Sequence, residues 1–368
     1  MKKSKKSGIS LIVLVITIIV IIILAVAVIL TIANNNPIEN AKQAVKANDE
    51  ATLKEAATVA QAQWYTEKQL DPTITKKVGE YVEETLASQG FKAEDIAKVA
   101  ATEDGVNIVT IPNGFRYLEG KASTEGYVIK NETDGNEFVW VPVNNISNFV
   151  REEGYSCGSP QSKLPDCSEP YETENYTSEI DEYNAMIASV SKYGGFYIGR
   201  YEASDNGSGV AQSLKDKAPW NSIAWGDSIT EVGTTGAVAK ARAVYSVESG
   251  TKEKDPVSTL IYGVQWDATV RWIKTNYPGI EKNSTDHGNH NTGSKINTGS
   301  NPSYKLNNIY DLAGNVEELT MEACSSYSVV GRGGEYVNTG SDSPVSARCD
   351  YPFLGFDFLG FRLALYIK

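Results

Sequence analysis

The sequence predicts an α+β protein whose first 104 residues are helical and whose remaining residues form an irregular mixed domain. An uncharged apolar run and an Ala-rich segment with helical periodicity occupy the first part. From about residue 105, Gly, Asn, Ser, Thr and aromatic residues become frequent, and short apolar runs alternate with turn-forming residues. With 368 residues, the chain is long enough for one large domain or two smaller ones.

The composition favours molecular recognition and argues against nucleic acid as a partner. The formal net charge is -12, and the sequence has no basic stripe that could replace the counterions of a phosphate backbone. The chain has 20 tyrosines, which suit contact surfaces, but only 2 histidines, the side chain that most often transfers protons near neutral pH. Four cysteines are too few for a disulfide scaffold, so a hydrophobic core must carry the fold.

The N-terminus combines a short cationic segment with a long apolar one. Four lysines lie within residues 1–8, and no charged residue occurs from Ile9 to Ala33. A helix over residues 9–33 would span roughly 37 Å, which is enough to cross a bilayer. Because the lysines stay in the cytoplasm, we expect a single-pass protein with an extracellular head at the cell surface. A cleaved signal peptide or a simple signal anchor is the alternative, although a cleaved signal ordinarily has a shorter apolar region.

The segment "KKSGISLI" resembles the leader of type IV pilins and pilin-like proteins. In that family a prepilin peptidase cuts after the Gly of a short basic leader, and the apolar helix remains as an anchor. The resemblance implies a leader over residues 1–8, cleavage between Gly8 and Ile9, and a transmembrane helix over residues 9–33. It implies the membrane, the peptidase and pilin-like subunits as partners. Val13 stands where the family usually has the Glu that aligns subunits, so entry into a filament stays open.

Residues 34–104 are expected to form a helical stalk. The motif "NNNP" at 34–37 interrupts the helix that leaves the membrane. The Ala-rich segment that follows has apolar residues at helical spacing and mixed charge, which predicts a long helix over about residues 38–69. Residues 78–100 predict one or two further short helices.

The remaining residues, 105–368, are expected to form one domain of strands, loops and a helix. Two β-rich runs flank the turn "TDGN" within residues 126–143 and predict a hairpin. Residues 194–204 predict a short strand that enters a loop, and residues 284–305 predict a long polar loop. Residues 260–277 predict an amphipathic helix. Three residues of this helix are expected to face the core: Trp266, Val270 and Ile273.

A series of six blocks runs through this domain. They are "GGFYIGRYEAS", "PWNSIAW" (219–225), "YGVQWDATVRWI", "NIYDLAGNVEELT" (308–320), "GRGGEY" (331–336) and "GFR" (360–362). Together they resemble the formylglycine-generating enzyme, or sulfatase-modifying factor, family over about two thirds of the chain. The resemblance implies a C-type-lectin-type fold for residues 105–368, an α+β domain with little regular secondary structure for its size.

Several residues within the blocks carry local structural expectations. Gly333 and Gly334 suit a tight backbone approach or a bulge. Gly314 and Asn315 suggest a turn with positive φ. Arg362 stands between two apolar residues, and a buried ion pair is favoured over an outward position on a strand.

The chain lacks the cysteines that the oxidases of this family use. Those enzymes have two cysteines just after R-G-G-S-x, which bind copper and oxidise a substrate cysteine. The matching segment here, "YVNTGSDSPVSAR", has none, and a lone Cys349 cannot bind Cu(I) through two thiolates. Glu317 and Leu319 replace the two tryptophans of the family's G-N-V-W-E-W block. We therefore expect no catalytic residues and no enzyme activity.

His287 and His290, in "DHGNH", could be metal ligands together with Asp286. A solvated polar loop is the favoured interpretation of this segment, so no metal site and no cofactor are expected. The sequence leaves open whether a structural calcium ion binds.

Two cysteine pairs are considered. Cys157 and Cys167 flank "GSPQSKLPD", and a loop of that size outside the membrane can close as a disulfide worth roughly 2–3 kcal/mol. Cys324 and Cys349 could pair as well, but their spacing does not decide it.

The stretch "CDYPFLGFDFLGFR" at 349–362 interleaves aromatic residues with acids and glycines. It resembles the variable region of proteins diversified by retroelements, which use the same lectin-type domain and in which a reverse transcriptase errs at adenines. Asn codons mutated at adenine cannot encode Lys, Glu, Gln, Met or Trp, and residues 336–367 contain none of these five. We therefore predict a displayed ligand-binding face over residues 336–359, because acids in a core strand would lack partners. Its predicted members are Val337, Asp342, Ser343, Cys349, Asp350, Tyr351, Phe353, Leu354, Phe356, Asp357, Phe358 and Leu359.

The expected partner is an extracellular protein or glycan. For the aromatic residues, the alternative is packing in the core. For the whole chain, two alternatives stay open: a pilin-like adhesin or minor pilin whose head is fixed in sequence, and an extracellular copper-dependent thiol oxidase. A nearby reverse transcriptase gene with an Asn-rich near-copy of the 3′ end would favour the diversified protein over the fixed adhesin.

Overall fold

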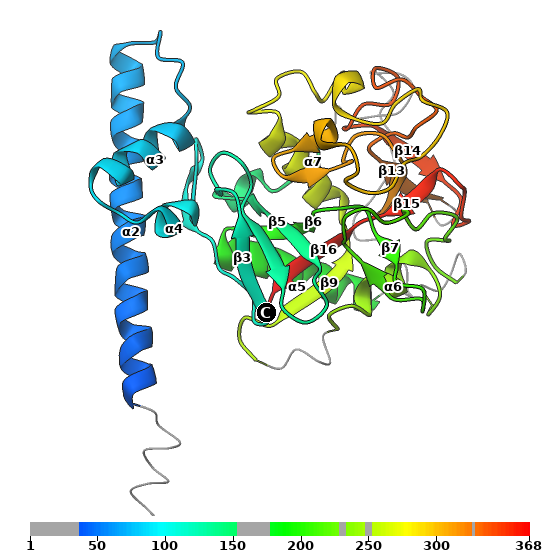
Figure 1. The fold of residues 1–368 in the computed structure, drawn as a ribbon, viewed down its shortest axis with the longest axis horizontal. Helices are drawn as coiled ribbons and strands as arrows, with labels where there is room; N and C mark the ends of the chain where they lie inside the picture. Colours follow the sequence, from blue (N-terminus) through cyan, green and yellow to red (C-terminus); the bar gives the residue numbers. More distant parts are fainter. Residues whose placement is uncertain (1–36, 153–176, 228–232, 247–251, 326–327) are drawn as a thin grey trace, which may run out of the picture. The chain divides into compact units, whose positions relative to one another are not determined.

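The structure, a computed structural model, describes residues 37–152, 177–227, 233–246, 252–325 and 328–368 (Figure 1). The predicted leader, the predicted membrane helix with Gly8 and Ile9, and the predicted Cys157–Cys167 disulfide lie outside these residues. Among the helices that the structure describes, none is both long enough and apolar enough to cross a membrane.

Most described residues of the predicted stalk are helical, but its last residues are not, because Val99–Thr102 form strand β1. Helix α2 (Pro37–Leu70) begins at a proline, which is favourable in the first turn because no backbone N–H is needed there. The chain divides into two compact units, 1–53 and 54–368, and α2 runs through the division. Two short helices follow in the second unit, α3 (Val78–Ser88) and α4 (Ala93–Ala97). The indole of Trp64 is buried and donates a hydrogen bond to the carbonyl of Lys76, 2.9 Å away, which ties α2 to the start of α3.

A small hairpin follows the helices, and it was not predicted. Strands β1 (Val99–Thr102) and β2 (Gly105–Ile108) pair antiparallel. The predicted start of the head, residue 105, is the first residue of β2. Asn144 anchors the hairpin through its side-chain amide, which donates to the carbonyls of Ala100 and Gly105 at 2.8 and 2.7 Å.

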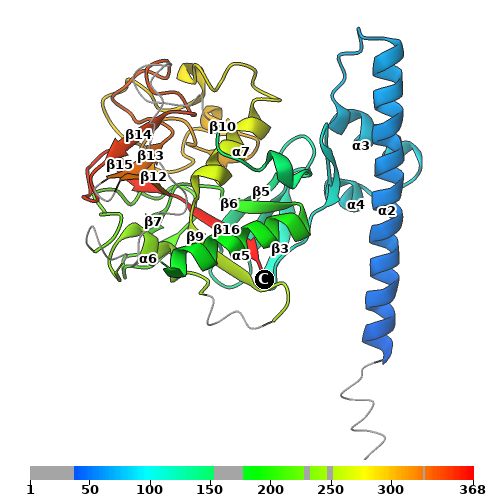
Figure 2. The ribbon, with the colours of Figure 1, turned by 180° about the vertical axis from the view of Figure 1, so that it is seen from behind.

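The largest sheet of the second unit has six antiparallel strands in the order β3-β4-β5-β6-β16-β9 (Figure 1). The predicted hairpin at "TDGN" is confirmed as β4 and β5, with Val128 opposite Val139. Helix α5 (Thr177–Tyr193) packs on strands β6 and β16 (Figure 2). The strands are β3 (Phe115–Glu119), β4 (Val128–Asn131), β5 (Glu137–Pro142), β6 (Gly195–Gly199), β9 (Pro256–Leu260) and β16 (Leu363–Ile367).

The predicted helix is confirmed as α7 (Gly263–Ile273), but it is not amphipathic, because every residue in it except Arg271 is buried. Its three predicted core residues, Trp266, Val270 and Ile273, are fully buried.

The short elements between the larger ones are η1 (Ile146–Asn148), β7 (Ser204–Asp205), β8 (Ala211–Gln212), α6 (Ala237–Arg242), η2 (Thr285–His287), η3 (Pro302–Tyr304), β10 (Lys305–Leu306) and β11 (Ile309–Tyr310).

A second sheet of four strands has the order β14-β13-β12-β15. Three of its strands pair antiparallel, while β12 and β15 are parallel. Because β15 is followed after one residue by β16, the chain passes here from the four-stranded sheet to the six-stranded one. The strands are β12 (Glu317–Ser325), β13 (Ser328–Arg332), β14 (Arg348–Tyr351) and β15 (Leu359–Phe361).

Arg362 is the residue between β15 and β16, and it forms the predicted buried ion pair. Its side chain is fully buried, and its Nε lies 2.8 Å from a carboxylate oxygen of Glu318 in β12. It also donates to the carbonyls of Gly199, at the end of β6, and Tyr310, in β11, at 2.9 and 3.0 Å. One guanidinium therefore joins both sheets and the β11 segment.

Two further local expectations are confirmed. Gly314 and Asn315 have φ of 74° and 66°, and Gly333 and Gly334 have φ of 96° and 73°. At Gly334 a Cβ atom would lie 2.2 Å from the carbonyl oxygen of Ser343, so only glycine fits this backbone approach.

The loop over residues 284–305 is less solvated than predicted. Ser284, Asn289, His290 and Thr298 are buried. Several polar groups of the loop form hydrogen bonds within the protein. The Oγ of Ser284 lies 3.1 Å from Nε2 of His290, and the Asn289 amide donates to Asn315 at 3.0 Å.

Replacing Arg362 with Met should destabilise the protein by about 3–5 kcal/mol, because Glu318 would remain buried without its partner. Urea unfolding measures the change. The double variant Arg362→Met/Glu318→Leu removes both charges and should recover most of the loss. A single variant within about 1 kcal/mol of the natural protein would contradict the role assigned to this pair.

Candidate ligand-binding face

The predicted face, residues 336–359, begins just after β13, passes through β14 and reaches β15. It therefore covers the loop between β13 and β14, strand β14 itself, and the loop from β14 to β15. These elements lie together at the four-stranded sheet (Figure 1).

Eight of the twelve predicted residues reach the surface wholly or in part, and we call these eight the binding face. Val337 and Leu354 are large apolar residues with exposed fractions of 55% and 65%. Three aspartates are exposed as well, and three aromatic residues are half-buried. The members of the binding face are Val337, Asp342, Asp350, Tyr351, Leu354, Phe356, Asp357 and Phe358.

The other four predicted residues, Ser343, Cys349, Phe353 and Leu359, are buried, so the prediction that they are displayed is wrong. The ring of Phe353 packs edge-on against Trp225, with 5.3 Å between centroids. Leu359 begins β15, beside Glu317 of β12. We call these four residues the buried support.

The remaining two members of the buried support are held by close packing. Ser343 lies against Gly334 at the tight approach described above. Cys349 faces Gly331 across the β13–β14 pair and is disulfide-bonded, so the expectation of a lone thiol is corrected.

The three aromatic rings of the binding face form one cluster. Phe356 and Phe358 stack with 5.4 Å between centroids and an interplanar angle of 17°. The ring of Tyr351 lies 6.2 Å from Phe356 and 5.6 Å from Phe358. The inner sides of these rings pack against the core, and their outer sides remain accessible.

A segment distant in sequence, residues 220–225, holds the loop that carries these rings. The backbone N–H of Ser222 donates to the carbonyl of Phe356 at 2.9 Å, and that of Trp225 donates to Phe353 at 3.1 Å. Gly355 is required at this contact, because a Cβ atom there would lie 2.5 Å from the carbonyl carbon of Ser222. The block "PWNSIAW" marked this segment in the sequence, but its contact with the face was not predictable from that block alone.

Glu317 is a buried carboxylate beneath the cluster, and the sequence did not indicate its role. It is 1% exposed, and one of its oxygens accepts a hydrogen bond of 2.8 Å from the hydroxyl of Tyr351. Its other oxygen has no hydrogen-bond partner among the described residues. Burial raises the pKa of Glu317 to about 8; the Tyr351 hydrogen bond and Arg332 oppose this shift, and the charge of Glu335 adds to it.

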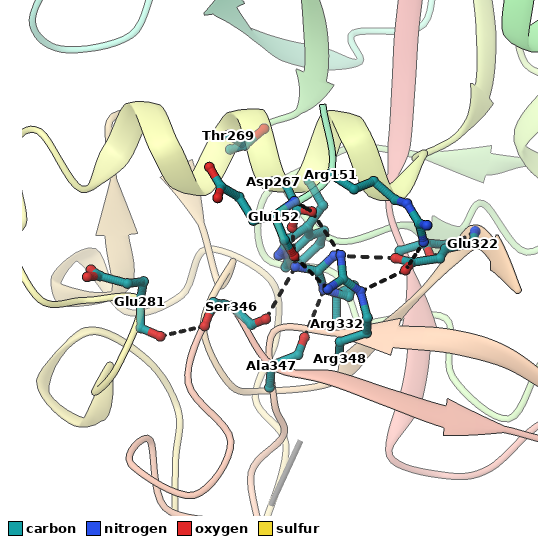
Figure 3. A network of polar contacts seen from close by, with 12 residues as sticks. Arg151, Glu152, Asp267, Thr269, Glu281, Glu322, Arg332, Ser346, Ala347 and Arg348 are labelled. Atoms are coloured by element: carbon teal, nitrogen blue, oxygen red, sulfur yellow. Dashed lines mark hydrogen bonds and ion pairs between the residues drawn. The ribbon is translucent and has the colours of Figure 1, made fainter. Parts of the chain in front are cut away.

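A buried network of charges holds the strands of the four-stranded sheet (Figure 3). Arg332 and Arg348 both reach Asp267 of α7, at 2.5 and 2.8 Å. Both also pair with Glu322 of β12, at 3.6 and 2.7 Å. Arg151 binds the same carboxylate at 2.7 Å. The network fixes β13 and β14 to α7 and β12, and it occupies Arg348, the one cationic residue of the sequence 336–359.

The candidate metal residues are not brought together as ligands. The ring of His290 is buried and hydrogen-bonded to Ser284, and burial lowers the pKa of His290 to about 4. Asp286, in contrast, is exposed. Within the described residues, no three His, Cys, Asp or Glu side chains are arranged to hold a metal ion.

No family model matches the chain, and no curated protein matches it either. Among solved structures, it is similar to Treponema denticola variable protein 1, with 16% identity and a TM-score of 0.30, over 47% of this chain and 84% of that one. It is also similar to PvdO from Pseudomonas aeruginosa, with 14% identity and a TM-score of 0.35, over 67% of this chain and 100% of that one. Identities and TM-scores this low assign neither a family nor a function to the chain.

Glu317 should make the protein less stable as the pH rises. Because its pKa is raised from 4.5 to about 8 on folding, its contribution is fully present below pH 4.5 and is lost as the pH rises toward 8. Within this window the slope is on the order of 1.4 kcal/mol per pH unit. Urea unfolding at a series of pH values should show that Glu317→Gln is less pH-dependent than the natural protein. Parallel curves for the two proteins would contradict the assignment.

Proposed function

We propose that this chain is a surface-anchored ligand-binding protein. Its head is a C-type-lectin-type scaffold without catalytic activity, and its binding face is diversified by a retroelement. The observation that carries the proposal is the division of residues 336–359 into eight residues at the surface and four in the buried support. The outer residues can change chemistry while the inner ones maintain the fold.

The surface chemistry of the binding face suits recognition of another molecule. Exposed apolar residues and half-buried rings lie on one segment, held by backbone hydrogen bonds from residues 220–225. Aromatic residues held in place give large contact area at low entropic cost, and such residues carry much of the energy of binding interfaces.

The residue types of the binding face support diversification. All eight are residue types that an Asn codon can come to encode through changes at adenine, and residues 336–367 lack the five residue types that cannot be reached. The buried ion pairs that support the face use residues mostly outside this range: Arg151, Asp267, Glu322 and Arg332.

The absence of catalysis is also a proposal. Copper bound as in the family's oxidases needs two thiolates, and Cys349, the only cysteine in residues 336–368, is disulfide-bonded. The residues present therefore do not fit such a copper site, and we derive no oxidase step for this chain.

Anchoring rests on the sequence of the first 33 residues. The lysines of residues 1–8 and the uncharged run of residues 9–33 support a membrane helix with the head outside the cell. The resemblance to pilin-like leaders adds processing between Gly8 and Ile9 by a prepilin peptidase, while Val13 leaves open whether pilin-like subunits are partners.

Diversification predicts where the gene varies. Deep sequencing of this gene, in a population grown from one cell of the source organism, should show an excess of substitutions in the codons for 336–359. The codons for 105–335 serve as the internal control. The substituted residues should exclude Lys, Glu, Gln, Met and Trp. Equal and low variation in both regions would contradict diversification and favour the adhesin with a fixed head.

A further inference from the structure

We propose that the binding face recognises a cationic side chain, Arg or Lys, on a polypeptide partner. This inference rests on the proposed function, because it names the chemistry of the ligand for the same face. It is carried by three observations together: the aromatic cluster, the acidic residues around it, and the unpaired oxygen of Glu317 beneath it.

Two acidic residues are immediate neighbours of the rings in the sequence. Asp350 immediately precedes Tyr351, and Asp357 stands between the stacked pair Phe356 and Phe358. Burial raises the pKa of Tyr351, and the charges of Glu317, Glu335 and Asp350 raise it further. These carboxylates therefore act on the same phenol. The aromatic cluster lies in a negative field.

No cation of the face itself balances this charge. Residues 336–359 contain three aspartates and one arginine, Arg348. Arg348 is buried and paired with Asp267 and Glu322, at 2.8 and 2.7 Å. Its charge is thus used to hold β14 in place, and a partner must supply the cation that complements the aspartates.

Glu317 provides the second, independent indication. A carboxyl oxygen that is nearly fully buried and has no hydrogen-bond partner is costly, and a hydrogen bond with a ligand would relieve that cost. The oxygen lies next to the aromatic cluster, because the other oxygen of the same carboxylate binds the hydroxyl of Tyr351. An approaching guanidinium or ammonium group would find aromatic rings for cation–π contact and the exposed carboxylates of Asp350 and Asp357 for ion pairing.

The exposed apolar residues favour a polypeptide, over other classes of partner, as the molecule that carries the cation. Leu354 is 65% exposed and Val337 is 55% exposed, so the face offers aliphatic contact beside the acids. A peptide segment that alternates basic and apolar side chains matches both features. An anionic membrane surface or a nucleic acid would be repelled by the aspartates, and a neutral glycan would leave their charge unbalanced.

The test is a binding titration of the full-length protein in detergent with two short peptides that differ in one feature. One peptide alternates Arg and Leu, and the other has citrulline, the neutral isostere, in place of each Arg. We expect the Arg peptide to bind about tenfold more tightly or better, and Asp350→Asn/Asp357→Asn to remove most of this preference. The matched control is Glu125→Gln/Glu132→Gln, which makes the same change in net charge at two exposed residues flanking β4.

The outcomes separate this inference from the proposed function. Equal binding of both peptides, lost in Phe356→Ser/Phe358→Ser, would overturn the cationic ligand but support the binding face. An Arg preference lost equally in the control variant would reflect overall acidity and overturn the inference. Failure of both peptides to bind the natural protein would overturn it as well. Binding of the Arg peptide that survives Phe356→Ser/Phe358→Ser would contradict the binding face itself. Thermal melts of each variant establish that it is folded.

Discussion

The buried guanidinium of Arg362 is the interaction on which the arrangement of the head depends. It lies where the chain leaves β15 of one sheet and enters β16 of the other, and it binds Glu318 of β12, Gly199 of β6 and Tyr310 of β11. A cation in this position must be compensated, because an unpaired buried charge costs several kcal/mol. Burial raises the pKa of two nearby carboxyl groups, Glu202 and Asp311, the latter to about 6. Arg362 opposes both shifts.

A second buried network performs a similar function beneath the binding face. Asp267 of α7 and Glu322 of β12 hold the guanidinium groups of Arg332 and Arg348, at the end of β13 and the start of β14. These ion pairs hold the β13–β14 pair in addition to the hydrogen bond from Tyr351 to Glu317. This arrangement suits a protein whose surface residues vary, because the ion pairs that hold the strands do not involve any of the eight residues of the binding face.

Much of the fold could be predicted from the sequence, because the decisive patterns were local. Helix α2, the β4–β5 hairpin and the inward residues of α7 follow from periodicity and turn chemistry within one segment. The short β1–β2 hairpin carried too weak a pattern to be recognised. His290 is buried beside Ser284, whose hydroxyl also accepts a hydrogen bond from the backbone of the distant Val345, so a polar sequence was mistaken for a solvated loop.

The candidate site was predictable only in part, for a related reason. Phe353 and Phe356 are the same residue type three positions apart, yet one is buried against Trp225 and the other is partly exposed. Leu354 and Leu359 differ in the same way, because Leu359 lies in β15 against β12. Glu317 could be noted only as a replacement for a tryptophan, since its position under Tyr351 depends on the pairing of distant strands. Sequence identified the segment, and long-range packing decided which side of it faces the solvent.

The central claim is that residues 336–359 consist of a variable surface on an invariant support. Two libraries of the full-length protein test it most directly, one randomised at Val337, Asp342, Asp350, Leu354 and Asp357, the other at Ser343, Cys349, Phe353 and Leu359. Sequencing the variants that survive limited proteolysis measures how many remain folded in each library. The account predicts that most variants of the first library survive and most of the second do not, since the loss of a buried aromatic or leucine side chain costs on the order of 2–5 kcal/mol. Equal survival in the two libraries would contradict it.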